Sequence, residues 1–279
     1  MILRTRFAPS PTGLLHLGHA FSALTAWDLA RAAGGSCLLR IEDLDGGRSR
    51  PEYETALRDD LAWLGLAWPE PVLRQSRNLA AYAAALDRLT ALGLVYPCSC
   101  TRADIRAATS APQEGAESLV YPGTCRGRPM AGMRPGDAVR LDTTAALAAA
   151  GRLHWTETGP EAPGRHPVDA AALAPLGDVV LARKDIGAAY HLAVVVDDAA
   201  QGISHVVRGA DLLGATPLHR LLQALLGLPE SVWHHHRLIR DAAGRRLAKR
   251  DDARALSTLR AEGASPADIR RMVGLAVDL

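Results

Sequence analysis

The sequence predicts an α/β fold, and three stretches near the N-terminus lead to that prediction. Arg4–Phe7 reads as a short strand, and the loop Ala8–Gly13 that follows contains prolines and a glycine, which prevent regular structure. Apolar residues then recur at helical spacing over Leu17–Ala32. Ser36–Asp43 is an apolar run that ends in charge, as buried parallel strands do. The order strand, rigid loop, helix, strand is typical of an α/β sheet.

Composition excludes several classes of protein. The chain has 279 residues, 48% of them hydrophobic, which is enough for a sizeable core and one or two domains. We see no apolar stretch that could span a membrane and no signal peptide, and the four cysteines fit a reducing compartment. We therefore expect a cytoplasmic protein. The net charge of +2 neither favours nor excludes nucleic acid, so any RNA contact must use local patches such as Arg237–Arg254.

The rest of the chain alternates between helical and strand-like segments. Tyr96–Pro167 is rich in Gly, Pro and Thr and predicts an insertion that forms a second domain. We expect a first catalytic half (1–95), the insertion (96–175), a second catalytic half (176–230) and a C-terminal helical segment (231–279). The expected helices are 51–66, 79–94, 216–226 and one that starts at Ser265; the expected strands are 138–141, 153–156, 178–181, 190–197 and 204–207.

His16 and His19 lie three residues apart in the first turn of the predicted helix, so both face one side of its N-terminus. That end carries free N–H groups and a partial positive charge, which suit a phosphate chain. Two solvated histidines are the alternative for such a pair taken alone.

Two motifs resemble the signatures of class I aminoacyl-tRNA synthetases. His16-Leu17-Gly18-His19 resembles the first, and the preceding Phe7–Gly13 resembles its glutamyl branch. Arg246-Leu247-Ala248-Lys249-Arg250 resembles the second, a Lys-Met-Ser-Lys-Ser loop, with Lys249 at the second lysine. The resemblance implies a Rossmann-type catalytic domain that binds ATP through His16, Gly18, His19 and Lys249.

Lys249 has a chemical reason to be a lysine. Lys184 and Lys249 are the only lysines among the 32 basic residues, so a compact ammonium marks a special position. An ammonium can stabilise the negative charge that builds on phosphates during attack at an α-phosphate. A solvated basic loop is the alternative. Ala248 departs from the family by lacking a hydroxyl.

The resemblance also implies a pocket for glutamate. Arginine is the natural bidentate partner of a carboxylate, and a carboxylate that of an ammonium. The positions that match the family's glutamate contacts are Arg6, Ser10, Glu42, Tyr190 and Arg208, with Arg6 on the side-chain carboxylate and Glu42 on the ammonium. Each has a plainer alternative: a solvated strand end for Glu42, a core position for Tyr190, and a surface ion pair for Arg208.

Three cysteines suggest a metal site. Cys98 and Cys100, one residue apart, could share a tetrahedral Zn²⁺ with Cys125. The family places a tyrosine four residues before the last cysteine, which implies Tyr121 as the fourth ligand. His154 or His166 would be more ordinary ligands, and three free cysteines in a core remain the alternative. A structural zinc would order the insertion.

The resemblance extends from Thr5 to about Arg250, and 30 residues follow Lys249 (279 − 249). A full glutamyl-tRNA synthetase continues into anticodon-reading domains. The chain therefore resembles the short paralogues that activate L-glutamate with ATP-Mg²⁺ and attach it to queuosine at the wobble position of tRNA(Asp). We expect a monomer that binds the tRNA(Asp) anticodon stem-loop. A small glutamyl-tRNA synthetase that charges the 3′ end, and a non-catalytic binding module, are the alternatives.

Overall fold

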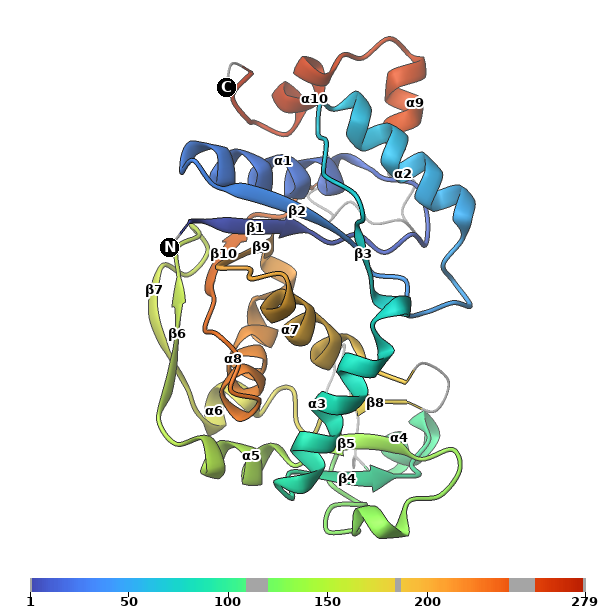
Figure 1. The fold of residues 1–279 in the computed structure, drawn as a ribbon, viewed down its shortest axis with the longest axis vertical. Helices are drawn as coiled ribbons and strands as arrows, with labels where there is room; N and C mark the ends of the chain where they lie inside the picture. Colours follow the sequence, from blue (N-terminus) through green and yellow to red (C-terminus); the bar gives the residue numbers. More distant parts are fainter. Residues whose placement is uncertain (1, 109–119, 184–186, 241–253, 278–279) are drawn as a thin grey trace.

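The computed structural model describes residues 2–108, 120–183, 187–240 and 254–277 (Figure 1). The strands are β1 Arg4–Phe7, β2 Ser36–Ile41, β3 Leu73–Arg74, β4 Val95–Cys98, β5 Ala138–Leu141, β6 Leu153–Glu157, β7 Gly164–Val168, β8 Val180–Ala182, β9 His205–Gly209 and β10 Val232–His236. The α-helices are α1 Leu17–Ala32, α2 Pro51–Trp63, α3 Leu79–Ala91, α4 Arg102–Ala108, α5 Thr143–Ala150, α6 Ala170–Leu173, α7 Tyr190–Ala200, α8 Thr216–Leu225, α9 Leu256–Ala261 and α10 Pro266–Met272.

The predicted α/β architecture is confirmed at its N-terminal part. β1 pairs with β2 in parallel, and β2 pairs with β3 in parallel. Helix α1 connects β1 to β2 and packs against both strands, as a parallel crossover requires. The bounds of β1 and α1 are those that the sequence predicts.

A second set of parallel strands continues this surface. β10 pairs in parallel with both β9 and β6, and β7 is added antiparallel to β6. β9 runs beside β1, where the Ser204 N–H donates to the Arg4 carbonyl oxygen over 3.0 Å. In Figure 1, β9 and β10 accordingly lie next to β1. The carboxyl ends of β1, β2, β9 and β10 therefore face one region, which is where open α/β sheets bind ligands.

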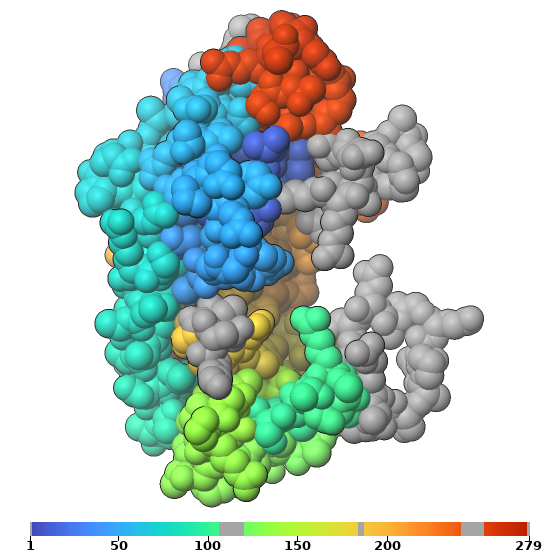
Figure 2. All heavy atoms as spheres, turned by 90° about the vertical axis from the view of Figure 1, so that its right-hand side faces the viewer, coloured from blue at the N-terminus to red at the C-terminus, as the bar shows by residue number. Residues whose placement is uncertain are grey.

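A separate antiparallel sheet has the order β4-β5-β8. Figure 2 shows this part (green) at the opposite end of the molecule from α9 and α10 (red). The sheets combine strands from both sides of the expected domain boundaries. β6 of the expected insertion pairs with β10 of the expected C-terminal segment, and β5 of the insertion pairs with β8 of the second catalytic half. The division into domains stays a prediction.

The two largest apolar clusters of the described residues lie on either side of the parallel strands. The larger is formed by α5, α7, α8 and the strands around them, with Trp155, Leu181 and Trp233 buried inside it. The other joins α1 and α2 to the C-terminal helices, where Leu256, Leu259 and Ile269 contribute. Within the described residues, no helix is both long and apolar enough to cross a membrane.

The prediction of a strand at 190–197 is wrong, because these residues begin helix α7. Val-rich runs are ambiguous when all sides are buried, and here Leu192, Val195 and even Asp197 are buried. Because consecutive residues of this helix are buried, the sequence lacks the alternation of apolar and polar residues by which an amphipathic helix is predicted. Strand β10 was not predicted, because consecutive histidines obscure its apolar character.

Asp197 fixes α7 to α3 at the edge of the parallel sheet. Its side chain is fully buried and accepts hydrogen bonds from Gln75 Nε2 (2.8 Å), Asn78 Nδ2 (2.7 Å) and the Tyr82 hydroxyl (2.8 Å). The Arg40 guanidinium lies 3.9 Å away. Because every oxygen of this buried carboxylate is satisfied, the contact holds α7, and the residues it presents, in one place.

We predict that Tyr82→Phe lowers the free energy of unfolding by about 1.5–3 kcal/mol, the usual cost of losing a hydrogen bond to a charged group. Asp197→Ala should cost more, about 3–5 kcal/mol, because it also leaves Arg40 with less compensation. Urea unfolding followed by circular dichroism measures both. Tyr53→Phe, which removes a hydroxyl that bonds to no described residue, is the control; equal stability of all three variants would contradict the role of Asp197.

Candidate active site

A cavity of about 600 Å³ opens at the carboxyl ends of β1, β2, β9 and β10. Eight of the residues that the sequence analysis singled out line it, although they come from distant parts of the chain. They are Arg6, Ser10, His16, Gly18, His19, Glu42, Tyr190 and Arg208. The described residues of both expected sites, for glutamate and for phosphate, therefore share one cavity. The role of each residue stays a prediction that activity measurements can test.

The start of α1 is capped by histidines in place of the usual Ser or Asp. His16 is the N-cap, and its Nδ1 accepts from the Gly18 N–H (3.1 Å). His19 Nδ1 in turn accepts from the backbone N–H of His16 (3.2 Å). In the neutral rings, both protons must then sit on Nε2, on the side away from the helix backbone. The helix N-terminus thus presents two imidazole donors of fixed tautomer.

Gly18 leaves room for this arrangement. A Cβ added at Gly18 would lie 3.0 Å from Cε1 of the His16 ring, closer than most Cβ contacts. A larger residue would therefore require the His16 ring to move by a few tenths of an ångström.

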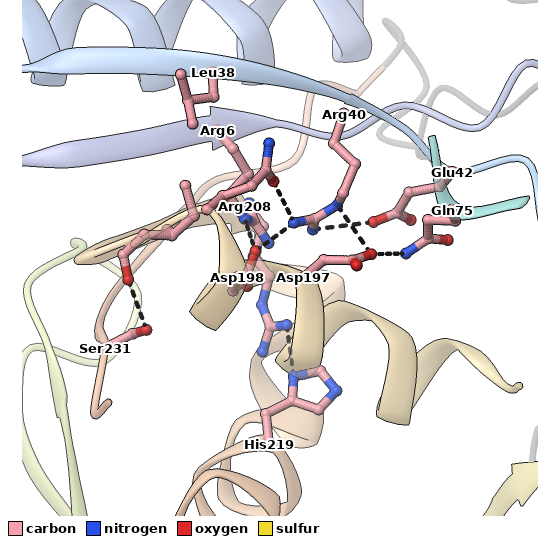
Figure 3. Close-up of polar contacts among 12 residues, drawn as sticks. Arg6, Leu38, Arg40, Glu42, Gln75, Asp197, Asp198, Arg208, His219 and Ser231 are labelled. Carbon is pink, nitrogen blue, oxygen red and sulfur yellow. Dashed lines mark hydrogen bonds and ion pairs between the residues drawn. The ribbon is translucent and has the colours of Figure 1, made fainter. Parts of the chain in front are cut away.

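The base of the cavity is a buried network of charges (Figure 3). Asp198 accepts from Arg6 Nε at 3.0 Å and from Arg40 Nη1 at 2.7 Å. Glu42 accepts from Arg40 Nη2 at 3.3 Å. Arg6 also donates through Nη1 to the Val207 carbonyl (2.9 Å), which joins β1 to β9.

The two carboxyls of this network respond differently to burial. Burial raises the pKa of Glu42 above its ordinary value, and the attraction of Arg40 and Arg6 only partly opposes the shift. Burial also acts to raise the pKa of Asp198, but there Arg6 and Arg40 outweigh it and hold the pKa below its ordinary value. The two arginines thus favour the ionised form of Asp198 more strongly than that of Glu42.

The sequence analysis missed Arg40. A charged residue inside the apolar run Leu38–Ile41 is the signal that could have found it, because a buried guanidinium needs a buried partner. Its partners come from α7, and that helix was itself predicted as a strand.

Arg208 is not the surface ion pair that the sequence left open, because it is 5% exposed. Its hydrogen bonds go to His235, His219, Leu212 and Thr216. Tyr190 lines the same cavity, and its ring meets that of His219 edge-on at 5.8 Å between centroids.

The three cysteines are brought together on and beside β4. The sulfur atoms of Cys98, Cys100 and Cys125 all lie within 4.8 Å of one another. The Tyr121 hydroxyl lies 3.4 Å from Cys98 Sγ and 3.7 Å from Cys100 Sγ. Burial acts to raise the pKa of Cys125, but hydrogen bonds, above all with Tyr121, lower it to about 6. These donors suit a soft cation such as Zn²⁺.

The two histidines considered as alternative ligands are placed elsewhere. His154 and His166 lie on β6 and β7, in the sheet that contains β10, and the His166 ring stacks on Trp155. Neither belongs to the group of potential ligands around Cys98.

The second signature, Arg246–Arg250 with Lys249, lies outside the described residues. Its described flanks are informative. Ile239 lines the cavity, and beyond the segment Ala255 forms an antiparallel bridge with His16. The Leu256 N–H donates to the Leu15 carbonyl oxygen over 2.8 Å. Both ends of the chain around the signature are thus fixed beside the start of α1.

The chain can now be compared with known proteins. Residues 2–276 match the family of class I tRNA synthetases (E and Q), catalytic domain. The chain is 59% identical to the glutamyl-Q tRNA(Asp) synthetase of Rhodobacter capsulatus, a match that covers 97% of this chain and 99% of the relative. It is 42% identical to the glutamyl-Q tRNA(Asp) synthetase of Nitratidesulfovibrio vulgaris, over 96% of this chain and 84% of the relative.

Among solved structures, the fold is similar to a glutamate tRNA ligase from Elizabethkingia meningosepticum in complex with its amino acid, with a TM-score of 0.72 and 25% identity. The match covers 98% of this chain and 60% of that ligase, so the chain spans less than two thirds of the larger enzyme. The family model and these two relatives each match almost the whole chain. The chain therefore belongs to the class I (E and Q) tRNA synthetase family and, within it, to the glutamyl-Q tRNA(Asp) synthetases.

Proposed function

We propose that the protein activates L-glutamate with ATP and transfers it to the cyclopentenediol of queuosine at the wobble position of tRNA(Asp), without charging a 3′ end. The observation that carries this proposal is the sequence similarity, over almost the entire chain, to relatives named glutamyl-Q tRNA(Asp) synthetase. The cavity supports it, because cationic and anionic groups of the kind that glutamate needs line the same space as the histidine-capped helix.

In the first step, an oxygen of the glutamate α-carboxylate attacks the α-phosphorus of ATP, and pyrophosphate leaves with the electron pair of the broken P–O bond. Arg6 would read the side-chain carboxylate and Glu42 the ammonium, whose charge would favour the ionised form of Glu42. Ser10, Tyr190 and Arg208 complete the pocket.

The phosphates of ATP-Mg²⁺ would lie against the start of α1. There the free N–H groups, together with the Nε2–H groups of His16 and His19, can donate to phosphate oxygens. Lys249, which lies outside the described residues, would stabilise the leaving pyrophosphate. In the second step, a queuosine hydroxyl attacks the acyl carbon and AMP leaves.

We further propose that Cys98, Cys100, Cys125 and Tyr121 hold one Zn²⁺. The described donors fit a tetrahedral site with mixed sulfur and oxygen ligands. When bound, the metal would cross-link β4 to the chain around Cys125 and so stabilise this end of the molecule.

We predict that Lys249→Ala lowers glutamate-dependent pyrophosphate exchange by about 100-fold or more, because it removes a cation that acts mainly in the transition state. The KM for glutamate should change little. The matched control is Lys184→Ala, which removes the other lysine and should leave the exchange rate near that of the wild type. Exchange at the normal rate in Lys249→Ala would remove this residue from the mechanism.

Metal analysis tests the zinc site. The variant with both Cys98→Ser and Cys125→Ser should lose its zinc and melt at a lower temperature, because half of the ligands are replaced by hydroxyls. Cys37→Ser is the matched control, since Cys37 lies on β2 and outside the cluster. One zinc per chain in both variants would refute the ligand assignment. Zinc retained in Tyr121→Phe would reassign only the fourth ligand.

The acceptor can be identified with radiolabelled glutamate and three RNAs. We expect labelling of tRNA(Asp) that contains queuosine, and none of the same tRNA with guanosine or of tRNA(Glu). Glutamate-dependent pyrophosphate exchange should proceed without RNA, and an isolated queuosine-containing anticodon stem-loop should accept the label. Label at the 3′ end of tRNA(Glu), with none on queuosine, would show instead a small glutamyl-tRNA synthetase.

A further inference from the structure

Arg208 differs from the other two arginines at the base of the cavity in the kind of partner it has. Arg6 and Arg40 both contact the carboxylate of Asp198. Arg208 is equally buried, yet among the described residues none of its hydrogen-bond partners is a carboxylate. It binds two imidazoles, a hydroxyl and a carbonyl, and it also interacts with the Tyr190 hydroxyl. Asp198 attracts its charge but is not one of these hydrogen-bond partners.

The contact with His219 fixes the protonation of two rings. Arg208 Nη1 lies 2.9 Å from His219 Nδ1, and since a guanidinium only donates, this nitrogen must accept. The proton of His219 is then on Nε2, from which it donates to Nδ1 of His191 over 3.0 Å. A protonated His219 would point a hydrogen at Arg208, so the ring must be neutral.

The contact with His235 obeys the same logic. Arg208 Nε donates to His235 Nε2 over 3.0 Å, which places the His235 proton on Nδ1. Nδ1 lies 2.5 Å from the buried carboxylate of Glu157. Glu157 also accepts from the backbone N–H groups of His235 (2.8 Å) and Gly159 (2.6 Å). The ring is thus held between an anion on one side and the arginine on the other.

We propose that His219 and His235 are positioning residues for glutamate recognition: as neutral acceptors, they hold the Arg208 guanidinium in place while leaving its positive charge for a carboxylate of the substrate. This inference rests on the proposed function. A carboxylate at either position would hold Arg208 as well but would cancel the charge that attracts the amino acid, whereas a residue with no acceptor would leave a buried N–H unpaired.

The surroundings keep both rings neutral. Burial lowers the pKa of His219 well below its ordinary value, and the nearby charge of Arg208 lowers it further. Burial also lowers the pKa of His235, against the opposing effect of Glu157. As neutral rings, the two imidazoles neither repel the charge of Arg208 nor cancel it, as the proposal requires.

Two variants of equal shape separate positioning from charge. Asn and Asp both place an oxygen where Nδ1 of His219 lies, and they differ only in charge. We expect the KM for glutamate in pyrophosphate exchange to stay within about threefold of the wild type in His219→Asn and to rise at least about tenfold in His219→Asp, which is about 1.4 kcal/mol of binding. The kcat and the KM for ATP should change little in both. Equal KM values for glutamate in the two variants would overturn the inference.

Loss of the acceptor gives a second test that does not depend on the folding of His219→Asp. His235→Gln can place an oxygen where Nε2 lies, whereas His235→Leu cannot; likewise His219→Leu removes the acceptor that His219→Asn keeps. The two Leu variants should raise the KM for glutamate about tenfold over their amide counterparts, and equal values within each pair would also overturn the inference. Wild-type protein without glutamate-dependent exchange would instead refute the proposed function itself.

Discussion

The burial of three guanidinium groups beneath one cavity is the constraint on which the rest of the structure depends. Arg40 is 0% exposed, Arg6 4% and Arg208 5%, so each has lost nearly all contact with water. Removing a charge from water is expensive unless fixed partners replace the solvent. The fold provides these partners from α7, α8 and β10, which explains why Asp197, Asp198 and a pair of neutral histidines occupy positions that apolar residues would otherwise fill.

At the start of α1, fixed side-chain acceptors likewise take the place of water as partners of the backbone N–H groups. Histidines at the N-cap and at the third helical position satisfy the helix backbone through Nδ1, which places the proton of each neutral ring on Nε2. Asp would cap this helix as well, but an ionised carboxylate has only acceptors and would offer no donor beyond the backbone. The Pro-rich loop before α1 and the bridge from Ala255 to His16 then fix this end of the helix against the cavity.

The sequence predicted the parts of the structure that depend on local chemistry. β1, α1 and β5 have the expected bounds, and Ser265 caps α10 together with Asp268 as its sequence indicates. The failures arise where tertiary burial decides. Residues 190–197 were taken for a strand because α7 is buried nearly all round, and the polar partners of Arg208 were missed because tautomers and contacts between β9, β10 and α8 leave no local pattern.

The charge network also joins the two halves of the parallel sheet. Arg6 and Arg40 come from β1 and β2, whereas Asp198 comes from α7, more than 150 residues later in the chain. The first half alone would bury Arg6 without a carboxylate partner and would leave Arg40 with only the Glu42 carboxylate. The carboxylate that allows β1 and β2 to bury their arginines therefore arrives only with the second half. Since Arg208, Tyr190 and Glu42 line the cavity above these same contacts, the cavity depends on residues from both halves of the chain.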